Sequence, residues 1–416
     1  MERKAVRVAL AGMLLVAATG SGAGAQQLPD RDVVLTPALQ DVYAVGAMDG
    51  AEWETFGEIR GVAFDGAGNL YVLDAMNFRV TVVDPRGRLV RAFGTRGDGP
   101  GEFRLPTAMA VLPDGTAVIQ DLRHAAYLVF GPGGAFQGSV PLAPGGAAMR
   151  SLSVSAGQLI PDLRGGAVYD AGMDLALAGE ATGGGRPIRR VPLDEGSERT
   201  RVHVPWRPDE PSSDRVIHRP DGTTGVRLGG GQRIWEPATH VAPLPDGGVA
   251  VVDSTTWAVD LVDPRGGVRA TLRRPGLRPI PVTERLSRSE RERRIRALEE
   301  RGPGMRVEMN GVSLSREQLM QMARSRVEEA TFYHEVPVLD GLRSSPAGLL
   351  WLRRSGPGSG DDAAIDLVRW EGTYVGTLRG LRLPAAIGPD GLVAWIERDG
   401  FDVPRVVVRR MPEGLR

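Results

Sequence analysis

The sequence predicts an all-β fold, a six-bladed β-propeller with a helical insertion between blades four and five. The first observation behind this prediction is a unit of short apolar strands, separated by Asp-Gly and similar turns, that recurs six times. The second is an alternation of period two within each copy, as at Val80 and Val82, which is typical of strands. The third is spacing, because a bare copy is about 45 residues long, the size of a four-stranded propeller blade.

Six residues that end the first strand of a copy give the phase of the repeat: Asp74, Asp121, Asp170, Asp253, Arg354 and Glu397. They are separated by 47, 49, 83, 101 and 43 positions. The two long intervals predict insertions at about 200–236 and 283–330 within a single propeller domain, 26–416. A carboxylate that recurs in every blade is expected to accept hydrogen bonds from its own turn rather than to hold a metal. Arg79 is expected to brace its blade in the same way.

The N-terminus resembles a secretory signal, residues 1–25. The run MERKAVR is basic, a short apolar stretch follows, and AGA precedes Gln26 as a small-residue cleavage site. We expect cleavage after Ala25 and a periplasmic or secreted protein. No later apolar run reaches about 18 residues, so no membrane insertion is expected. The short alternating strand Asp41–Gly46 is expected to pair with residues 405–410 and close the ring.

Composition excludes several kinds of chemistry. The chain has no cysteine, and Lys4 is its only lysine, so a mature chain has no thiolate, Schiff-base lysine or phosphate-loop lysine. Loss of residues 1–25 removes three basic residues and one acidic residue from totals of 51 and 51. The remaining 48 and 50 are close to balance, so charge gives no reason to expect a nucleic-acid partner. The ring is expected to be a monomer.

The first copy resembles the NHL repeat over residues 60–104. The run Gly-Asn-Leu-Tyr-Val-x-Asp-x-x-Asn-x-Arg-Val stands at Gly68 to Val80, and the link Phe-Gly…Gly-x-Gly-Pro-Gly-Glu-Phe stands at Phe93 to Phe103. The second and fourth copies match in part, and the third, fifth and sixth lack the Asn-x-Arg pair. The whole chain is similar to the exported six-bladed propeller proteins of bacteria, a group defined by fold.

The two insertions differ in character. Residues 200–236 are rich in proline and glycine and contain Trp206 and Trp235, which are candidate ligand-binding residues. Residues 283–330 predict two helices, with capping boxes at Ser287 and Ser315, around the Asn-Gly turn of a tight hairpin. Long loops on a rigid scaffold often carry specificity. The alternative is that the helices only pack beside the ring.

Candidate binding residues at the channel come from the residues that break the repeat. Eight positions before the blade glycines, where the innermost strand begins, stand Arg60, Thr107, Thr239 and Asp340, with His240 next to Thr239. Arginine would bind an anion, and His240 and Asp340 could share a proton or a metal. The alternative is that these residues are solvated strand ends. No residue is assigned a catalytic role.

Two functions remain open. The first is a binding or scaffold module that recognises a protein, peptide or glycan through the channel mouth and the insertions, with no cofactor. The second resembles the six-bladed lactonases and amidating lyases, which hold a divalent metal such as calcium in the channel. That resemblance implies three or four channel-facing Asp, Glu, Asn or His ligands, and only His240 and Asp340 qualify here.

Overall fold

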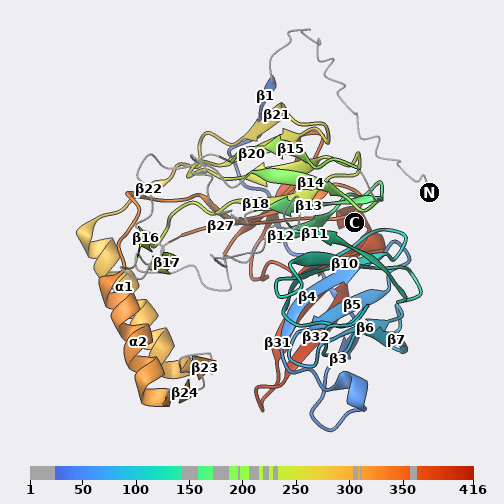
Figure 1. The fold of residues 1–416 in the computed structure, drawn as a ribbon. Coiled ribbons are helices and arrows are strands. Elements are labelled where there is room, and N and C mark those ends of the chain that lie inside the picture. Colours follow the sequence, from blue (N-terminus) through green and yellow to red (C-terminus); the bar gives the residue numbers. More distant parts are fainter. Residues whose placement is uncertain are drawn as a thin grey trace, which may run out of the picture.

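The structure is a six-bladed β-propeller, which confirms the predicted fold class (Figure 1). The computed structural model describes residues 24–142, 158–171, 187–194, 197–205, 215–218, 224–227, 233–302, 308–309, 312–313, 315–356 and 363–416. The innermost strands lie side by side around the channel in the order β4, β8, β12, β18, β26 and β30, and β30 returns to β4. The ring is therefore closed, and each blade is an antiparallel sheet that starts at the channel.

Each blade has four strands that run outward from the channel, in chain order except for the outer strand of blade six, which comes from the N-terminal segment. Blade one contains β4 (Ile59–Phe64), β5 (Leu70–Asp74), β6 (Arg79–Val83) and β7 (Leu89–Phe93). Blade two contains β8 (Pro106–Val111), β9 (Ala117–Asp121), β10 (Ala126–Phe130) and β11 (Phe136–Pro141). Blade three contains β12 (Gln158–Pro161), β13 (Ala167–Ala171), β14 (Ile188–Pro192) and β15 (Thr200–His203). Blade four contains β18 (His240–Pro243), β19 (Val249–Val252), β20 (Ala258–Val262) and β21 (Val268–Arg273). Blade five contains β26 (Leu339–Ser344), β27 (Leu349–Arg354), β28 (Ile365–Arg369) and β29 (Thr373–Leu378). Blade six contains β30 (Ala386–Ile387), β31 (Leu392–Arg398), β32 (Pro404–Arg410) and β3 (Gln40–Val45).

The second strand of a blade is buried on both faces, since a neighbouring blade covers each side. In β5, Leu70 and Val72 belong to the apolar core shared with blade six. Tyr71 and Leu73 point the other way, into the core shared with blade two. All four are at most 1% exposed. The period-two pattern therefore divides one strand between two inter-blade cores, and a blade cannot bury its surface without two neighbours.

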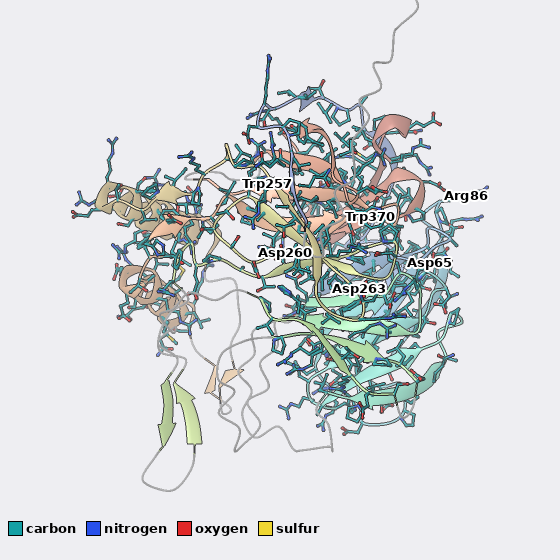
Figure 2. The ribbon with its side chains drawn as sticks, turned by 90° about the horizontal axis from the view of Figure 1, so that it is seen from above. Asp65, Arg86, Trp257, Asp260, Asp263 and Trp370 are labelled. Atoms are coloured by element: carbon teal, nitrogen blue, oxygen red, sulfur yellow. The ribbon has the colours of Figure 1, made fainter. Side chains whose placement is uncertain are left out.

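The Asp-Gly type turns are built as the sequence predicts. In the turn between β4 and β5, the Asp65 carboxylate accepts hydrogen bonds from the backbone N–H groups of Ala67 and Asn69 at 3.0 and 2.8 Å (Figure 2). Gly68 has φ 82°, a left-handed conformation that glycine adopts without steric cost. The recurring glycine after the aspartate thus lets the strand reverse within a few residues.

The N-terminal segment supplies an outer strand to three consecutive blades. As expected, β3 pairs antiparallel with β32 and completes blade six. Two further strands were not predicted: β1 (Gly24–Gln27) pairs in parallel with β21 of blade four, and β2 (Val34–Leu35) pairs in parallel with β29 of blade five. Because β1 begins at Gly24, cleavage after Ala25 would remove two of its four paired residues.

A buried network of charges fixes this segment between blades four and five. Arg274, which is fully buried, lies 3.1 Å from an oxygen of Asp32 and 3.0 Å from an oxygen of Asp366. Arg354 contacts the same two carboxylates at 2.5 and 2.6 Å. The indole of Trp257 donates to Asp366 at 2.7 Å. Two buried guanidinium groups therefore face two carboxylates, and one carboxylate comes from the N-terminal segment.

The second insertion is a helical hairpin that stands beside the ring in both views (Figures 1 and 2). Helix α1 (Glu284–Arg301) starts four residues earlier than its predicted capping box implies, because the Thr283 hydroxyl, not Ser287, accepts the capping bond. Helix α2 (Arg316–Glu329) has the predicted capping box at Ser315. No helix in the described residues is long and apolar enough to cross a membrane.

Short pairs of strands connect the hairpin to the ring and close its tip. Helix α2 packs against α1, and its Met322 stays 42% exposed. At the base, β22 (Ile280–Pro281) pairs with β25 (Glu335–Val336). At the tip, β23 (Glu308–Met309) pairs with β24 (Val312–Ser313) as the Asn-Gly motif predicts. In the first insertion, β16 (Arg215–His218) and β17 (Thr224–Arg227) form another hairpin.

Asp32→Asn is expected to destabilise the protein by about 3 kcal/mol, because two buried arginines would then share one carboxylate. Asp41→Asn removes an ion pair with Arg409 whose carboxylate is 84% exposed, and it should cost less than about 1 kcal/mol. Urea unfolding of both variants measures the difference. Equal effects would contradict a structural role for the buried network.

The same carboxylate predicts a pH dependence. Hydrogen bonding to Arg354 lowers the pKa of Asp32 to about 2, against the opposing effect of burial. The native state therefore favours the ionised form, and the stability this provides is present above pH 4. It is expected to be lost as pH falls from about 4 to 2, and this loss should be absent in Asp32→Asn.

Candidate functional site

A β-bulge places one extra residue at the start of several innermost strands. In blade one, Ile59 pairs with Asp74 and Gly61 pairs with Leu73, so Arg60 has no partner of its own. The same shift in register leaves Thr107 unpaired in blade two and Asp340 unpaired in blade five. Thr239 lies one residue before β18. A bulge turns a side chain away from the regular pleat, so these residues are placed differently from the rest of the repeat.

The order of the blades brings only two of the candidate residues together. His240 begins β18 and Asp340 lies on β26, and these two innermost strands are neighbours in the ring. Arg60 lies on β4, which is opposite β18, and forms an ion pair with Glu58 at 2.8 Å. The hypothesis that Arg60, His240 and Asp340 converge is therefore supported for the last two and not for Arg60.

The two threonines are bonded within the framework. The hydroxyl of Thr107 donates to the side-chain oxygen of Gln120 at 3.0 Å and to its backbone carbonyl at 3.3 Å. The carbonyl of Thr239 accepts from the side-chain amide of Gln158 at 3.1 Å. Both residues position strands, and their hydrogen bonds lie at the edge of the channel.

Gln158 of blade three holds the backbone on both sides of His240. Its Nε2 donates to the carbonyl of Thr239, and its Oε1 accepts from the N–H of Val241 at 3.1 Å. No pattern in the sequence indicates this contact, because the third copy is among those that depart most from the repeat. Gln158 therefore fixes the backbone position from which the His240 side chain extends.

Two arginines of blade five surround His240 and Asp340. Arg353 donates to the Asp340 carboxylate at 2.7 Å. Arg343 donates to the carbonyls of Leu342 and Ala385 at 2.8 and 3.4 Å. Burial raises the pKa of Asp340, and Arg353 opposes that rise. Burial and the nearby Arg353 lower the pKa of Arg343.

His240 is neutral at pH 7. Burial, together with the positive charges of Arg343 and Arg353, lowers its pKa to about 4. A neutral imidazole carries one N–H donor and one acceptor nitrogen, so His240 can form directional hydrogen bonds without charge. The site therefore combines one neutral imidazole, one carboxylate and two guanidinium groups.

A cavity of about 220 Å³ lies between His240 and Asp340 of this group and the helical insertion, and Arg343 and Arg353 are not among the residues that line it. His240 and Asp340 line it from the ring, and Glu290, Arg293 and Arg294 line it from α1. Glu290 is 4% exposed and binds Arg293 and Arg294 at 2.6 and 2.8 Å. The first turns of α1 thus belong to the wall of a site and are not a wholly solvated helix.

Of the two tryptophans predicted to bind a ligand, Trp235 lines this cavity, and Trp206 lies outside the described residues. Trp235 adopts a left-handed backbone with φ 65°, and its ring packs on Phe332 at 5.2 Å between centroids. This contact joins the end of the first insertion to the segment that follows helix α2. Trp235 therefore supports the wall of the cavity as well as forming part of it.

A larger groove of about 910 Å³ runs between the outer parts of blades two and three. Two of its polar groups are already bonded within the protein: Asp114 to Thr116, and Arg199 to the carbonyls of Pro141 and Leu142. None of the predicted site residues lines it. We therefore place the candidate site at the smaller cavity, where residues that interrupt the repeat meet.

The strand-end carboxylates follow the turn-capping prediction only in part. Asp74 accepts from the N–H group of Asn77 in its own turn, and Asp121 accepts from those of Arg123 and His124 in its own turn. Each also accepts from N–H groups just before the first strand of its blade, those of Gly57 and Glu58 and those of Arg104 and Leu105. Arg79 braces its blade by donating to the carbonyls of Glu52 and Thr55.

The prediction is wrong for Asp170 and Glu397. Asp170 lies inside β13, which ends at Ala171, and accepts from the hydroxyl of Tyr127 in blade two. Glu397 binds Arg382 and Arg405. The third copy lacks the sequence landmarks of the first, which explains the misplaced phase at Asp170.

Among the described residues, no group of three or more His, Asp or Glu side chains is placed to hold a metal ion. At the channel mouth, Asp340 is bonded to Arg353, which competes with a metal for its oxygen. The donor set that the metal-dependent alternative requires is not found in the described part of the chain.

No protein-family model matches the chain, and no curated protein matches it either. Solved structures with a similar fold include a gluconolactonase from Xanthomonas campestris, at 12% identity and a TM-score of 0.42, covering 90% of this chain and 89% of that one. Virginiamycin B lyase from Staphylococcus aureus has 7% identity and a TM-score of 0.41, with 89% and 99% covered. The calcium-binding protein regucalcin from Agrobacterium tumefaciens has 13% identity and a TM-score of 0.36, with 91% and 95% covered. Likeness at this level carries no inference about activity, and the resemblance to NHL repeats stays a prediction from the sequence.

The imidazole of His240 is expected to titrate near pH 4, and Arg343→Gln should raise that pKa because it removes one of two nearby positive charges. NMR titration of histidine-labelled protein, assigned with His240→Gln, measures both values. The unfolded chain binds a proton below about pH 6.5 while the folded chain does not. His240 should therefore reduce stability as pH falls from about 6.5 to 4. A wild-type value near 6.5 would contradict the burial of this site.

Proposed function

We propose that the protein is an exported binding module that holds a peptide or glycan ligand at the channel mouth, against helix α1. The observation that supports this most directly is the cavity lined from both sides, by His240 and Asp340 of the ring and by Glu290, Arg293 and Arg294 of the insertion. Residues that interrupt the repeat in two different ways, at a bulge and in an insertion, meet in this one place.

The size and polarity of the cavity favour recognition of a small polar group. Drug-sized ligands fill cavities of about 300–1,000 Å³, whereas this cavity measures about 220 Å³. It fits one side chain, chain end or sugar unit of a larger ligand, whose remainder would lie along the helical hairpin. Charged and hydrogen-bonding groups dominate its wall, so specificity would come from polar contacts.

The sequence supports export through the signal-like residues 1–25, and the structure adds one relevant fact. Strand β1 starts at Gly24, so a mature chain that begins at Gln26 keeps Gln26 and Gln27 on blade four, together with β2 and β3. The buried contact of Asp32 also stays. Processing at the expected position is therefore compatible with the closed ring.

The proposal is tested by measuring the binding of a defined panel of short peptides and oligosaccharides by calorimetry. For any ligand found, Arg294→Ala and His240→Gln should each weaken binding by about tenfold, because both remove a polar group from the cavity wall. Arg86→Ala is the matched control, since Arg86 is exposed on blade one, away from the hairpin (Figure 2). A ligand that binds all variants equally would place its site elsewhere.

The metal-dependent alternative makes a different prediction for the same protein. Calcium or zinc present in stoichiometric amount after purification, together with a melting temperature that falls by several degrees on chelation, would favour it. The binding-module proposal expects the melting temperature to be the same with and without chelator. Elemental analysis and thermal unfolding of one sample give both answers.

A further inference from the structure

We propose that the group bound at the channel mouth is a small oxyanion, held by Arg343 with Arg353 and His240 beside it. This inference rests on the proposed function, because it concerns the same site and names the chemistry of its ligand. Carboxylate and phosphate are the two groups of this kind that match the fork of a guanidinium.

The first observation is that Arg343 has no carboxylate partner among the described residues. Its guanidinium donates only to the backbone carbonyls of Leu342 and Ala385, and the second of these bonds is long, at 3.4 Å. Arg353, the other arginine of this cluster, uses the only carboxylate present, that of Asp340. A cation that is largely removed from water and not neutralised is costly, and an anion that binds there reduces the cost.

The second observation is that His240 does not restore the balance of charge. It is uncharged at neutral pH, because burial and the two arginines lower its pKa to about 4. Its ring can therefore donate one hydrogen bond to an anion without adding a third positive charge. The group of His240, Asp340, Arg343 and Arg353 has one excess positive charge.

The third observation comes from helix α1 across the cavity. Arg293 and Arg294 share the single carboxylate of Glu290. The cavity wall itself includes Arg293 and Arg294 with Glu236, Glu290 and Asp340, while Arg233, Arg343 and Arg353 contact or adjoin these groups from outside the wall. Among the described residues these make five arginines and three carboxylates, so positive charge is in excess around the site in a chain whose total charge is zero.

The contact between blades four and five shows how the chain treats arginines that serve structure alone. Arg274, which follows β21 of blade four, and Arg354 of blade five each contact both Asp32 and Asp366. Among the described residues, Arg343 has no such carboxylate partner, although it lies in the same blade as Arg354. This difference indicates that the missing negative charge comes from a ligand.

The test uses the full-length mature protein and three probes: sodium glucuronate as a carboxylate, inorganic phosphate, and methyl glucoside as an uncharged sugar. Calorimetry at low ionic strength should show binding of at least one of the two anions and none of methyl glucoside. Arg343→Gln should weaken that binding at least about tenfold, since a charged hydrogen-bonding partner is lost. Arg369→Gln, at an exposed position on β28 of the same blade, should bind as the wild type does.

Thermal unfolding without ligand separates a binding role from a structural role. If Arg343 awaits an anion, Arg343→Gln should melt at the same temperature as the wild type or higher, because an unpaired charge has been removed. The bound anion should raise the melting temperature of the wild type and not of the variant.

Four results would overturn the inference. The first three are a loss of several degrees in ligand-free Arg343→Gln, undiminished anion binding by that variant, and no binding of either anion by the wild type. The fourth is binding of methyl glucoside as tight as that of glucuronate, which would leave the proposed binding module intact. Conversely, failure of the peptide and oligosaccharide panel with clear anion binding would count against the proposed function alone. Preference for glucuronate over phosphate identifies a carboxylate as the group, and the reverse identifies a phosphate.

Discussion

The structure depends on one constraint, which is that every blade must be covered on both faces. The central strands show this most clearly, since adjacent residues such as Leu70 and Tyr71 belong to the cores on opposite sides of one blade. A blade at the end of an open row would expose half of these side chains. Closing the ring removes that exposure, so the last blade must adjoin the first. The N-terminal strand β3 completes blade six beside blade one and so joins the two ends of the chain.

The route of the N-terminal segment follows from the same constraint. To reach blade six, the chain first pairs with the outer strands of blades four and five, and Asp32 enters the gap between them. The buried arginines there have their opposite charges, so this part of the molecule is fixed by packing and by charge. A rigid frame results, and residues at the channel mouth can be held in irregular positions, such as the bulge at Asp340, without loss of the fold.

The sequence predicted the parts that repeat and some of those that interrupt the repeat. Turn chemistry and period two were enough for six blades, for the pairing of residues 41–46 with the last strand, and for the positions of His240 and Asp340. They were not enough for the phase of the third copy, where Asp170 was misplaced and Gln158 was missed. Nor could they show that Arg343 and Arg353 lie close to His240. Those positions depend on the strand register after the bulge at Asp340, and no local sequence pattern encodes that register. Strands β1 and β2 were missed because two to four residues carry too little alternation to be read.

The charges around the arginines of blade five provide the most specific evidence for a ligand. A residue type alone does not distinguish a structural arginine from one that binds a ligand, since Arg343 and Arg354 lie in adjacent strands of the same sheet. Their partners do distinguish them, because Arg354 contacts two carboxylates and Arg343 contacts only carbonyl groups. In a chain without lysine beyond Lys4, arginine must serve both roles. Arg79 and Arg199 also donate to carbonyl groups, so the case for Arg343 rests on its place beside His240 as well as on its partners. Between blades four and five, Asp32 and Asp366 contact every arginine of the network, including the exposed Arg379, whereas no described carboxylate contacts Arg343. The proposed anion would supply the partner that Arg343 lacks.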